Sequence, residues 1–315
     1  MQLFKVKKSN IPSKLLKDKY IVPPFSVFNT HQPYWRDRLN TWKDIGVYKQ
    51  NGRAEMLSYD NRRMDKKAGK GKHTNGTSSF NPVLCEVVYK WFTPHEQSLI
   101  IDPFAGGIVR GAVASILGHI YRGFDISKEQ VDSNYNLYYD LIGKYNMSGV
   151  ANWLYADSSN IDKLNTDVEY DLLFTCPPYY NLEVYSDDKN DLSNQESYSD
   201  FLIKYEDIIK KSCDTLKEDS FAVIVVSEIR DKKTGEYYGF VADTIKAFQK
   251  AGLKYYNEII LYNDTGNLAI VSGDYLDRAR KVGRQHQNVL VFYKGDTKHI
   301  KEKFGKFYKE NINGK

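Results

Sequence analysis

Apolar runs of strand length alternate with helix-forming segments from Phe80 onward, and this alternation limits the possible folds more than any other feature. Strands are predicted at 98–102, 120–125, 152–156, 171–176 and 221–226, and helices at 82–92, from the turn at 103–107 to 117, from Ser127, at 197–216 and at 240–251. Such alternation predicts an α/β fold with a parallel sheet and right-handed crossovers. Two more strands, 253–262 and 289–293, follow without a helical pattern between them, which predicts an antiparallel edge.

The fourth predicted strand ends in the stretch Thr175-Cys176-Pro177-Pro178-Tyr179-Tyr180. Two consecutive prolines cannot continue a sheet ladder, because neither has an N–H group to donate. In open α/β sheets, ligands bind at the carboxyl ends of the strands. This stretch is therefore predicted to form the lip of an active site, with the ring of Tyr179 facing a flat substrate. The alternative is a strand terminator with a packed tyrosine.

Acidic residues end the first three predicted strands. Asp102 opens the turn Asp102–Gly107, where glycine lets the backbone approach a ligand closely. Asp125 is placed to accept ribose hydroxyls, and Asp157 to accept from an adenine amino group. The chain has no GxxxxGK[ST] phosphate loop. Together these features predict a nucleoside ligand without phosphates, such as S-adenosylmethionine. For each aspartate alone, a helix cap or turn role is the alternative.

Charge is distributed unevenly along the chain. Residues 1–75 hold 17 Lys/Arg against 6 Asp/Glu, and residues 294–315 hold 7 against 3. With a net charge of +5, residues 76–293 carry −10, so the basic ends are the parts suited to a polyanion. Residues 31–42 interleave aromatics with arginines and are predicted to begin a helix after Pro33. This mixture is suited to binding nucleic acid. The alternative is a helix docked on the body with its arginines in ion pairs. Residues 61–78 are predicted to form a basic flexible loop.

Composition also excludes several classes of protein. No apolar run approaches the roughly 20 residues of a membrane span, and the N-terminus lacks the apolar core of a secretion signal. The three cysteines are widely spaced and lack a histidine cluster, which argues against a disulfide framework or a metal site. A cytoplasmic protein without a metal is the expectation.

Two motifs carry a family resemblance. Asp102–Gly107 resembles the cofactor motif, and Cys176–Tyr179 the catalytic motif, of S-adenosylmethionine-dependent DNA amino-methyltransferases, which make N6-methyladenine or N4-methylcytosine. Phe80-Asn81-Pro82 resembles the element that covers the methionine end of the cofactor, and Gln285–Lys294 the closing strand. The likeness spans roughly 77–294 and is similar to the unpermuted motif order. It looks closest to phage or mobile-element enzymes, with restriction–modification as the implied setting.

The resemblance implies a Rossmann-like methyltransferase sheet, mostly parallel with an antiparallel edge strand, behind a basic N-terminal extension. The implied division is 1–76 for nucleic-acid contact, 77–295 for catalysis and 296–315 for a basic tail. The implied catalytic residues are Thr175, Cys176, Pro177, Pro178 and Tyr179. The implied cofactor-binding residues are Phe80, Asn81, Asp102, Pro103, Phe104, Ala105, Gly106, Gly107, Asp125, Ile126, Asp157 and Ser158.

In the family, the first catalytic side chain and a proline carbonyl accept the two hydrogens of the exocyclic amine, while an aromatic ring stacks on the flipped base. This chain departs from the pattern in its glycine spacing at Gly106-Gly107-Ile108 and in carrying Cys176 where Asp, Asn or Ser is usual. A thiol is a weak acceptor. Its shape, nearest to serine, favours cytosine N4, with adenine N6 as the alternative. Cys176 is not expected to be a covalent nucleophile.

The expected partner is double-stranded DNA. An RNA methyltransferase on the same fold and an inactive DNA-binding subunit are the alternatives. Residues 181–188 carry three acids and are expected to close over the base. Residues 228–235 and the basic loop 263–286 are candidates for DNA contact, with plain solvated surface as the alternative.

Overall fold

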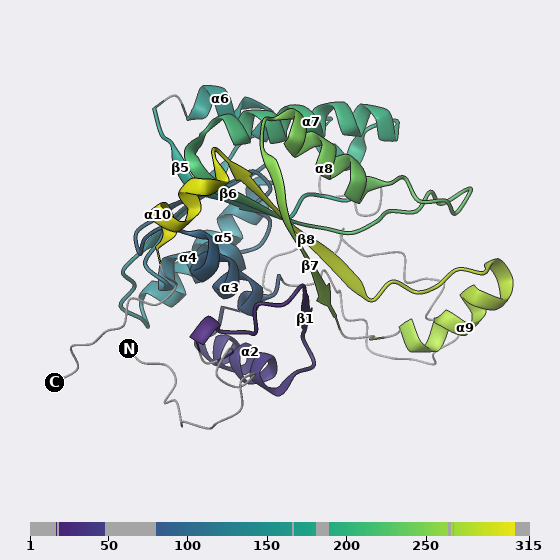
Figure 1. Ribbon diagram of the computed structural model, residues 1–315, viewed down its shortest axis with the longest axis horizontal. Coiled ribbons are helices and arrows are strands. Elements are labelled where there is room, and N and C mark those ends of the chain that lie inside the picture. Colours follow the sequence, from purple (N-terminus) through teal and green to yellow (C-terminus); the bar gives the residue numbers. More distant parts are fainter. Residues whose placement is uncertain are drawn as a thin grey trace.

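A computed structural model describes residues 17, 19–47, 80–165, 167–180, 189–263, 266 and 268–305. Its described strands form one sheet in the order β1-β7-β8-β6-β5-β2-β3-β4 (Figure 1). The strands are β1 (Val27–Asn29), β2 (Leu99–Asp102), β3 (Ile120–Asp125), β4 (Val150–Tyr155), β5 (Tyr170–Thr175), β6 (Leu216–Val226), β7 (Lys254–Tyr262) and β8 (His286–Lys294). The predicted mostly parallel α/β sheet is confirmed.

Helices cover both faces of this sheet. They are α2 (Pro33–Ile45), α3 (Pro82–Phe92), α4 (Val109–Ile116), α5 (Lys128–Ile142), α6 (Ile161–Leu164), α7 (Tyr198–Asp214), α8 (Phe240–Lys250), α9 (Leu268–Ala279) and α10 (Ile300–Phe304). Among the described residues, the 3-10 turns are η3 (Ser158–Asn160), η4 (Leu192–Asn194) and η5 (Thr297–His299). Figure 1 shows α3, α4 and α5 on one face and α6, α7 and α8 on the other. Alternate strand residues feed the two resulting cores: Leu172 packs in one and Leu173 in the other.

The antiparallel strand lies inside the sheet and not at its edge. β8 pairs antiparallel with β6 on one side and with β7 on the other, so β7 again runs parallel to the rest. The edge beyond β7 is closed by β1, which pairs parallel with it from Val27 to Asn29. The sequence did not predict β1, because a three-residue strand beside prolines carries no alternating pattern.

The segment between β7 and β8 contains a helix where the sequence predicted only a loop. α9 has no buried residue. A helix that faces no core lacks the amphipathic stripe by which sequence patterns reveal helices, so its pattern could not be seen.

Local signals placed the helix starts correctly. The Asn81 side chain accepts from the backbone N–H groups of Val83 and Leu84, at 3.0 and 3.3 Å, just before α3. Ser127 caps α5 by accepting from the Gln130 N–H at 3.2 Å. In a capping box the Gln130 side chain would accept from the Ser127 N–H. Here that N–H donates to Asp125 instead.

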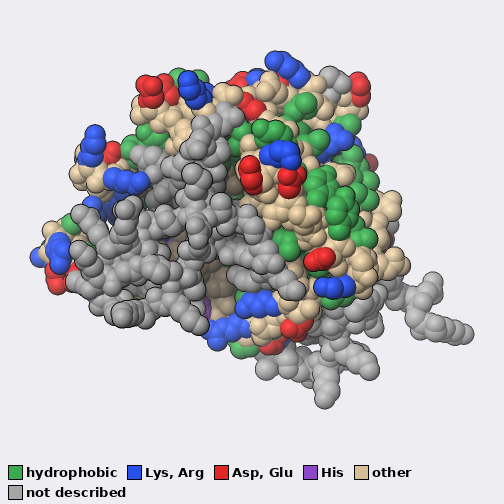
Figure 2. Space-filling model, turned by 180° about the vertical axis from the view of Figure 1, so that it is seen from behind, with side chains coloured by type: hydrophobic (Ala, Val, Ile, Leu, Met, Phe, Trp, Pro, Cys, Tyr) green, Lys and Arg blue, Asp and Glu red, His purple; other side chains and the backbone are tan. Residues whose placement is uncertain are grey.

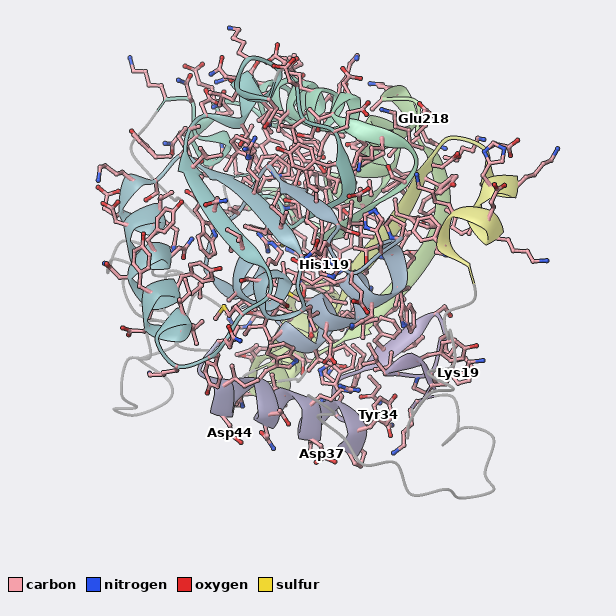
Figure 3. All side chains as sticks on the ribbon, turned by 90° about the vertical axis from the view of Figure 1, so that its left-hand side faces the viewer. Lys19, Tyr34, Asp37, Asp44, His119 and Glu218 are labelled. Carbon is pink, nitrogen blue, oxygen red and sulfur yellow. The ribbon has the colours of Figure 1, made fainter. Side chains whose placement is uncertain are left out.

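The described part of the N-terminal stretch is docked on the body. Trp35 and Trp42 of α2 are buried in the same core as α3. Glu86 of α3 accepts from Arg38 at 2.7 Å and from the Trp42 indole at 3.1 Å. Burial raises the pKa of Glu86, and Arg38 partly offsets this. Asp37 and Asp44 project from the outer side of α2 (Figure 3).

This arrangement matches the docked-helix alternative for residues 31–42. The basic loop 61–78, residues 1–16, residues 181–188 and the tail after residue 305 lie outside the described residues. The division at 76 and 295, and the nucleic-acid role of the N-terminal extension, stay predictions.

Candidate active site

The two motif turns lie at neighbouring strand ends. The chain runs from β2 outward to β3 and β4, then returns to place β5 on the other side of β2. The carboxyl ends of β2 and β5 therefore flank the point where the strand order reverses, which is where open α/β sheets bind ligands. The glycine turn follows β2 and the Pro-Pro turn follows β5. The fold thus brings the predicted cofactor and catalytic turns together.

The side chain of Asp102 connects these two turns through hydrogen bonds in the interior of the protein. Its carboxylate is fully buried and accepts from Thr175 Oγ1 at 2.6 Å, Arg110 Nε at 2.6 Å, the Tyr121 hydroxyl at 2.7 Å and the Phe104 N–H at 3.1 Å. The Thr175 side chain is also fully buried. The predicted roles of Asp102 as a cofactor ligand and of Thr175 as an amine acceptor stay predictions. Both side chains face each other inside the sheet and position the turns.

Arg110 is the buried cation of this network, and the sequence assigned it no role. Its Nη2 donates to the carbonyls of Phe104 and Ala105 at 2.6 and 2.9 Å, and its guanidinium lies 4.6 Å from the centre of the Phe80 ring. Burial alone would lower the Arg110 pKa, but the Asp102 carboxylate outweighs burial and raises it, so the side chain stays charged. Its only sequence signal is a lone charge in the apolar helix α4.

Hydrogen bonds fix the conformation of the glycine turn. Gly106 has φ +52°, a left-handed conformation that favours glycine. Its N–H donates to Asp125 at 2.8 Å and its carbonyl accepts from the buried Asn134 amide at 2.7 Å. A Cβ added at Gly107 would meet no atom within 4 Å, so this side of the turn has open space. Asn134 lies on α5 and was not predicted, because its contact spans two distant segments.

The aspartates at the ends of β3 and β4 differ in their roles. Asp125 is partly buried, and its second oxygen accepts from the Ser127 N–H at 2.8 Å. Asp157, also partly buried, caps η3 by accepting from the Ser159 N–H at 2.8 Å. Ser158 is buried and donates to the Pro103 carbonyl at 2.5 Å. The side chain of Ser158, like that of Asp102, therefore supports the turn, and the cofactor contact of both residues stays a prediction.

The Pro-Pro turn presents a held tyrosine. Cys176 and Tyr179 are partly buried, with the thiol sulfur 3.9 Å from the Tyr179 hydroxyl. Gln287 of β8 donates to that hydroxyl at 3.2 Å and itself accepts from Asn263 at 3.3 Å. The edge-on contact with Phe240 (ring centres 6.1 Å apart) fixes the Tyr179 ring further. Gln287 belongs to the closing-strand motif, but the sequence assigned it no role.

The next residue, Tyr180, anchors the turn with a strained backbone. Its φ is +43°, which non-glycine residues seldom adopt, and its side chain is buried. The ring contacts Tyr198, Phe201 and Tyr238 in an aromatic cluster. This packing stabilises a conformation that costs on the order of 1–3 kcal/mol and that is common at functional sites.

Metal and membrane sites are absent from the same residues. Among the described ranges, no three His, Cys, Asp or Glu side chains gather as a metal site. In that same part of the chain, no helix has the length and apolar character needed to cross a membrane. All three cysteines are thiols outside any disulfide, and burial raises the pKa of Cys85 and Cys213.

Comparison with known protein families gives a match to the C-terminal part. The model of the family N6_N4_Mtase, described as DNA methylase, matches residues 170–314, slightly less than half of the chain. The match begins with β5 and therefore contains the Pro-Pro turn. No curated protein matches the sequence significantly.

Solved structures give distant likenesses. TrmN from Thermus thermophilus has a TM-score of 0.44 at 14% identity, over 69% of this chain and half of that one. Magnesium protoporphyrin IX methyltransferase from Synechocystis PCC 6803 has 0.43 at 11%, over 77% and 95%. A “Putative DNA Modification Methylase”, also from Thermus thermophilus, has 0.33 at 20%, over 45% and 52%. Likenesses this distant say nothing about the substrate.

The sequence match and the candidate site lie in the same part of the chain. The matched segment supplies the strand and turn predicted to be catalytic, and the sheet places that turn beside the predicted cofactor turn. The fold is the Rossmann-like sheet expected of a methyltransferase. From β5 onward this chain matches the N6/N4 DNA methylases, and the sheet that carries the match is of the Rossmann-like methyltransferase type.

Proposed function

We propose that the chain transfers a methyl group to the exocyclic amine of a base flipped out of duplex DNA, with the residues of the two turns in defined roles. The observation that carries this proposal is the placement of Cys176–Tyr179 at the strand end next to the glycine turn, joined to it by the Thr175–Asp102 hydrogen bond. That bond places the acceptor groups and the cofactor turn on one rigid support.

The cofactor turn fits a nucleoside. Asp125 is only partly buried and accepts from the N–H groups of Gly106 and Ser127, and we assign the ribose hydroxyls to this carboxylate because it ends the strand beside the glycine turn. The space beside Gly107 admits the ligand, and the Phe80 ring, held by Arg110, borders the methionine end. The remaining proposed cofactor contacts come from Asn81, Pro103, Phe104, Ala105, Gly106, Ile126 and Asp157. Bound S-adenosylmethionine supplies the electrophilic methyl group.

The catalytic turn then positions the amine. We assign the stacking surface to Tyr179, whose contribution is about 1–3 kcal/mol for one base. The Pro177 carbonyl accepts one amine hydrogen and the Cys176 sulfur the other, which turns the nitrogen lone pair toward the methyl group, while Pro178 keeps the turn rigid. Positioning two bound reactants contributes roughly 7–11 kcal/mol, and flipping the base costs a few kcal/mol.

Cytosine N4 is the proposed target, because the small Cys176 side chain resembles serine in shape. Adenine N6 is the alternative. The elements lie in the unpermuted order along the chain, with Phe80–Pro82 before Asp102–Gly107 and Cys176–Tyr179 last. A phage or mobile-element setting, restriction–modification and a cytoplasmic location are part of the same proposal. The three reduced cysteines support a reducing compartment.

The test is transfer of tritium from labelled S-adenosylmethionine to unmodified duplex DNA, to RNA and to protein in parallel. Label in DNA, with N4-methylcytosine found by nucleoside analysis, supports the proposal. N6-methyladenine in its place would support DNA amino-methylation but make adenine the target base. Tyr179→Ala should lower kcat about 5- to 150-fold, the equivalent of one lost base stack. The exposed Tyr139→Ala on α5 is the matched control and should change nothing.

Label in RNA alone would show that RNA, and not DNA, is the substrate. An absence of label, with DNA binding intact and no binding of S-adenosylmethionine by calorimetry, would identify an inactive DNA-binding subunit.

A further inference from the structure

α9 projects from the carboxyl end of the sheet without a core beneath it. Figure 1 shows it standing away from the remaining helices at the far end of β7 and β8. Its 12 residues include none that is buried, and Ile270, Leu276 and nearby Val282 are 76%, 45% and 68% exposed. A helix of this length is marginal in water by itself, so a helix that buries nothing needs another source of stability.

The base of this projection is nevertheless well defined. The side chain of Leu268 packs against Gly283, where an added Cβ would collide with it. The Asn263 N–H donates to the Gln285 carbonyl at 2.9 Å, which closes the excursion at its root. Residues 268–285, hereafter the α9 arm, are therefore a compact projection on a fixed stem.

Basic groups from two separate segments meet at the arm. A Cβ on Gly235 would fall on the Lys281 ammonium group, so the turn that contains Lys232 and Lys233 lies against the arm. Arg278 and Arg280 are exposed on the same arm. Figure 2 shows Lys and Arg side chains along this edge of the molecule, at the left of that view. The two basic segments 228–235 and 263–286, far apart in the chain, thus form one surface.

The charge of this surface contrasts with the rest of the catalytic part. The arm carries four basic residues against Asp274 and Asp277, a balance of +2, whereas residues 76–293 as a whole carry −10. A local positive field at the carboxyl end of an otherwise acidic body favours an anionic partner at the active-site end of the sheet.

The stem of the arm is also bonded to the catalytic turn. The side chains of Asn263 and Gln287 are bonded to each other at the stem, and Gln287 donates to the Tyr179 hydroxyl at 3.2 Å. A partner bound by the arm is therefore next to the tyrosine proposed to stack on the base.

We infer that the α9 arm and the adjoining turn at 232–235 form the surface that grips duplex DNA beside the flipped base, and that Gln287 at the arm's stem positions Tyr179. This inference rests on the proposed function and adds to it the protein surface that binds the duplex. The arm's lysine and arginine side chains contact phosphates, and its exposed apolar side chains enter a groove. A second copy of the chain is the competing occupant, and self-association measurements separate the two.

The first experiment measures the affinity for a fluorescein-labelled 30-base-pair duplex by anisotropy at several salt concentrations. The arm variant is Arg278→Ala/Arg280→Ala/Lys281→Ala. The control, Lys210→Ala/Lys246→Ala/Lys250→Ala, removes the same charge from exposed positions of α7 and α8. We expect the arm variant to bind at least about tenfold more weakly and its log Kd–log salt slope to fall by about 0.9 for each phosphate that it no longer neutralises.

The control should stay within about threefold of wild type, as expected for a surface without phosphate contacts. Thermal unfolding and S-adenosylmethionine binding of both variants should match wild type. Equal affinity and slope in the arm variant and wild type would overturn the inference, as would unchanged DNA affinity with a loss of self-association in sedimentation. Failure of wild type to methylate DNA would instead overturn the proposed function, because the anisotropy experiment measures binding alone.

The second experiment tests the positioning role of Gln287 with a double-mutant cycle. Gln287→Leu should lower kcat roughly 2- to 12-fold, as for one hydrogen bond, with the KM for S-adenosylmethionine unchanged. In a Tyr179→Phe background the same substitution should have no further effect, because the accepting oxygen is gone. Additive effects of the two substitutions would show that Gln287 does not act through Tyr179.

Discussion

The Thr175 hydroxyl donates a 2.6 Å hydrogen bond to the buried Asp102 carboxylate, and these two residues are 73 positions apart in the chain. The bond joins the end of β5, which precedes the proposed catalytic turn, to the end of β2, which precedes the proposed cofactor turn. Arg110, bound to the same carboxylate, carries the connection on to the glycine turn. Under the proposed function, the spacing between the amine and the methyl group depends on this buried contact.

Breaking this network should lower stability most where a buried charge loses its partner. Asp102→Asn strands the Arg110 cation and should lower the free energy of unfolding by about 3–5 kcal/mol, whereas Thr175→Val removes one hydrogen bond to a charge, about 1.5–3 kcal/mol. Urea unfolding measures both. Lys250→Met, which breaks an exposed ion pair with Glu206, is the control and should cost less than about 1 kcal/mol. Equal losses in all three would contradict a buried network.

Substitution by alanine should affect stability at one glycine near the proposed cofactor turn and cofactor binding at another. A Cβ at Gly111 would collide with the Trp153 ring and come within 2.9 Å of Tyr121, so Gly111→Ala should destabilise by about 1–3 kcal/mol. Gly107→Ala meets no atom within 4 Å, so stability should be retained while the cofactor loses space. Thermal unfolding paired with calorimetric binding of S-adenosylmethionine checks both. Unimpaired cofactor binding by Gly107→Ala would place the cofactor elsewhere.

Substitution of Cys176 tests the proposed acceptor. Serine is close in size and its oxygen is the stronger acceptor, so Cys176→Ser should keep or raise kcat. Alanine has no acceptor, and Cys176→Ala should lower kcat about 2- to 12-fold, the equivalent of one hydrogen bond. Steady-state methylation of duplex DNA provides kcat, and the KM for S-adenosylmethionine is the internal control. Full activity in Cys176→Ala would remove the sulfur from the mechanism.

Stability should fall in mild acid because of His119. This side chain lies in the interior with neither ring nitrogen hydrogen-bonded, and burial followed by nearby Lys90 lowers its pKa to about 4 (Figure 3). Between pH 6.5 and 4 the unfolded chain binds a proton that the folded chain excludes, so the free energy of unfolding decreases as pH falls through this window, by up to about 3 kcal/mol.

Urea unfolding at about pH 8, 6 and 4.5, chosen to bracket the ordinary and lowered histidine pKa, measures the His119 effect. His119→Phe should flatten the profile over that range, and its difference from wild type at the highest pH reports packing alone. An equally steep profile in the variant would assign the acid sensitivity to other groups.

Helix starts and strand ends were predictable because their signals are local. Asn81 caps a helix by bonding the N–H groups two and three residues ahead, and β5 ends at Thr175, just before the Pro177-Pro178 pair. β1 and α9 escaped prediction for the opposite reason, since one depends on pairing with β7 and the other buries nothing. The antiparallel strand was predicted but not its position, because strand order is set by packing across the whole sheet.

The sequence by itself determined the strand–helix alternation, the Pro-Pro turn and the glycine turn, because each depends on residues adjacent in the chain. Only the tertiary structure decided which side chains pair with one another in the interior. Asp102 and Thr175 satisfy each other in the interior, while Gln287 reaches Tyr179 across 108 positions. A side chain's role follows from its partners in space, and for a buried carboxylate the requirement that every oxygen be paired settles that role.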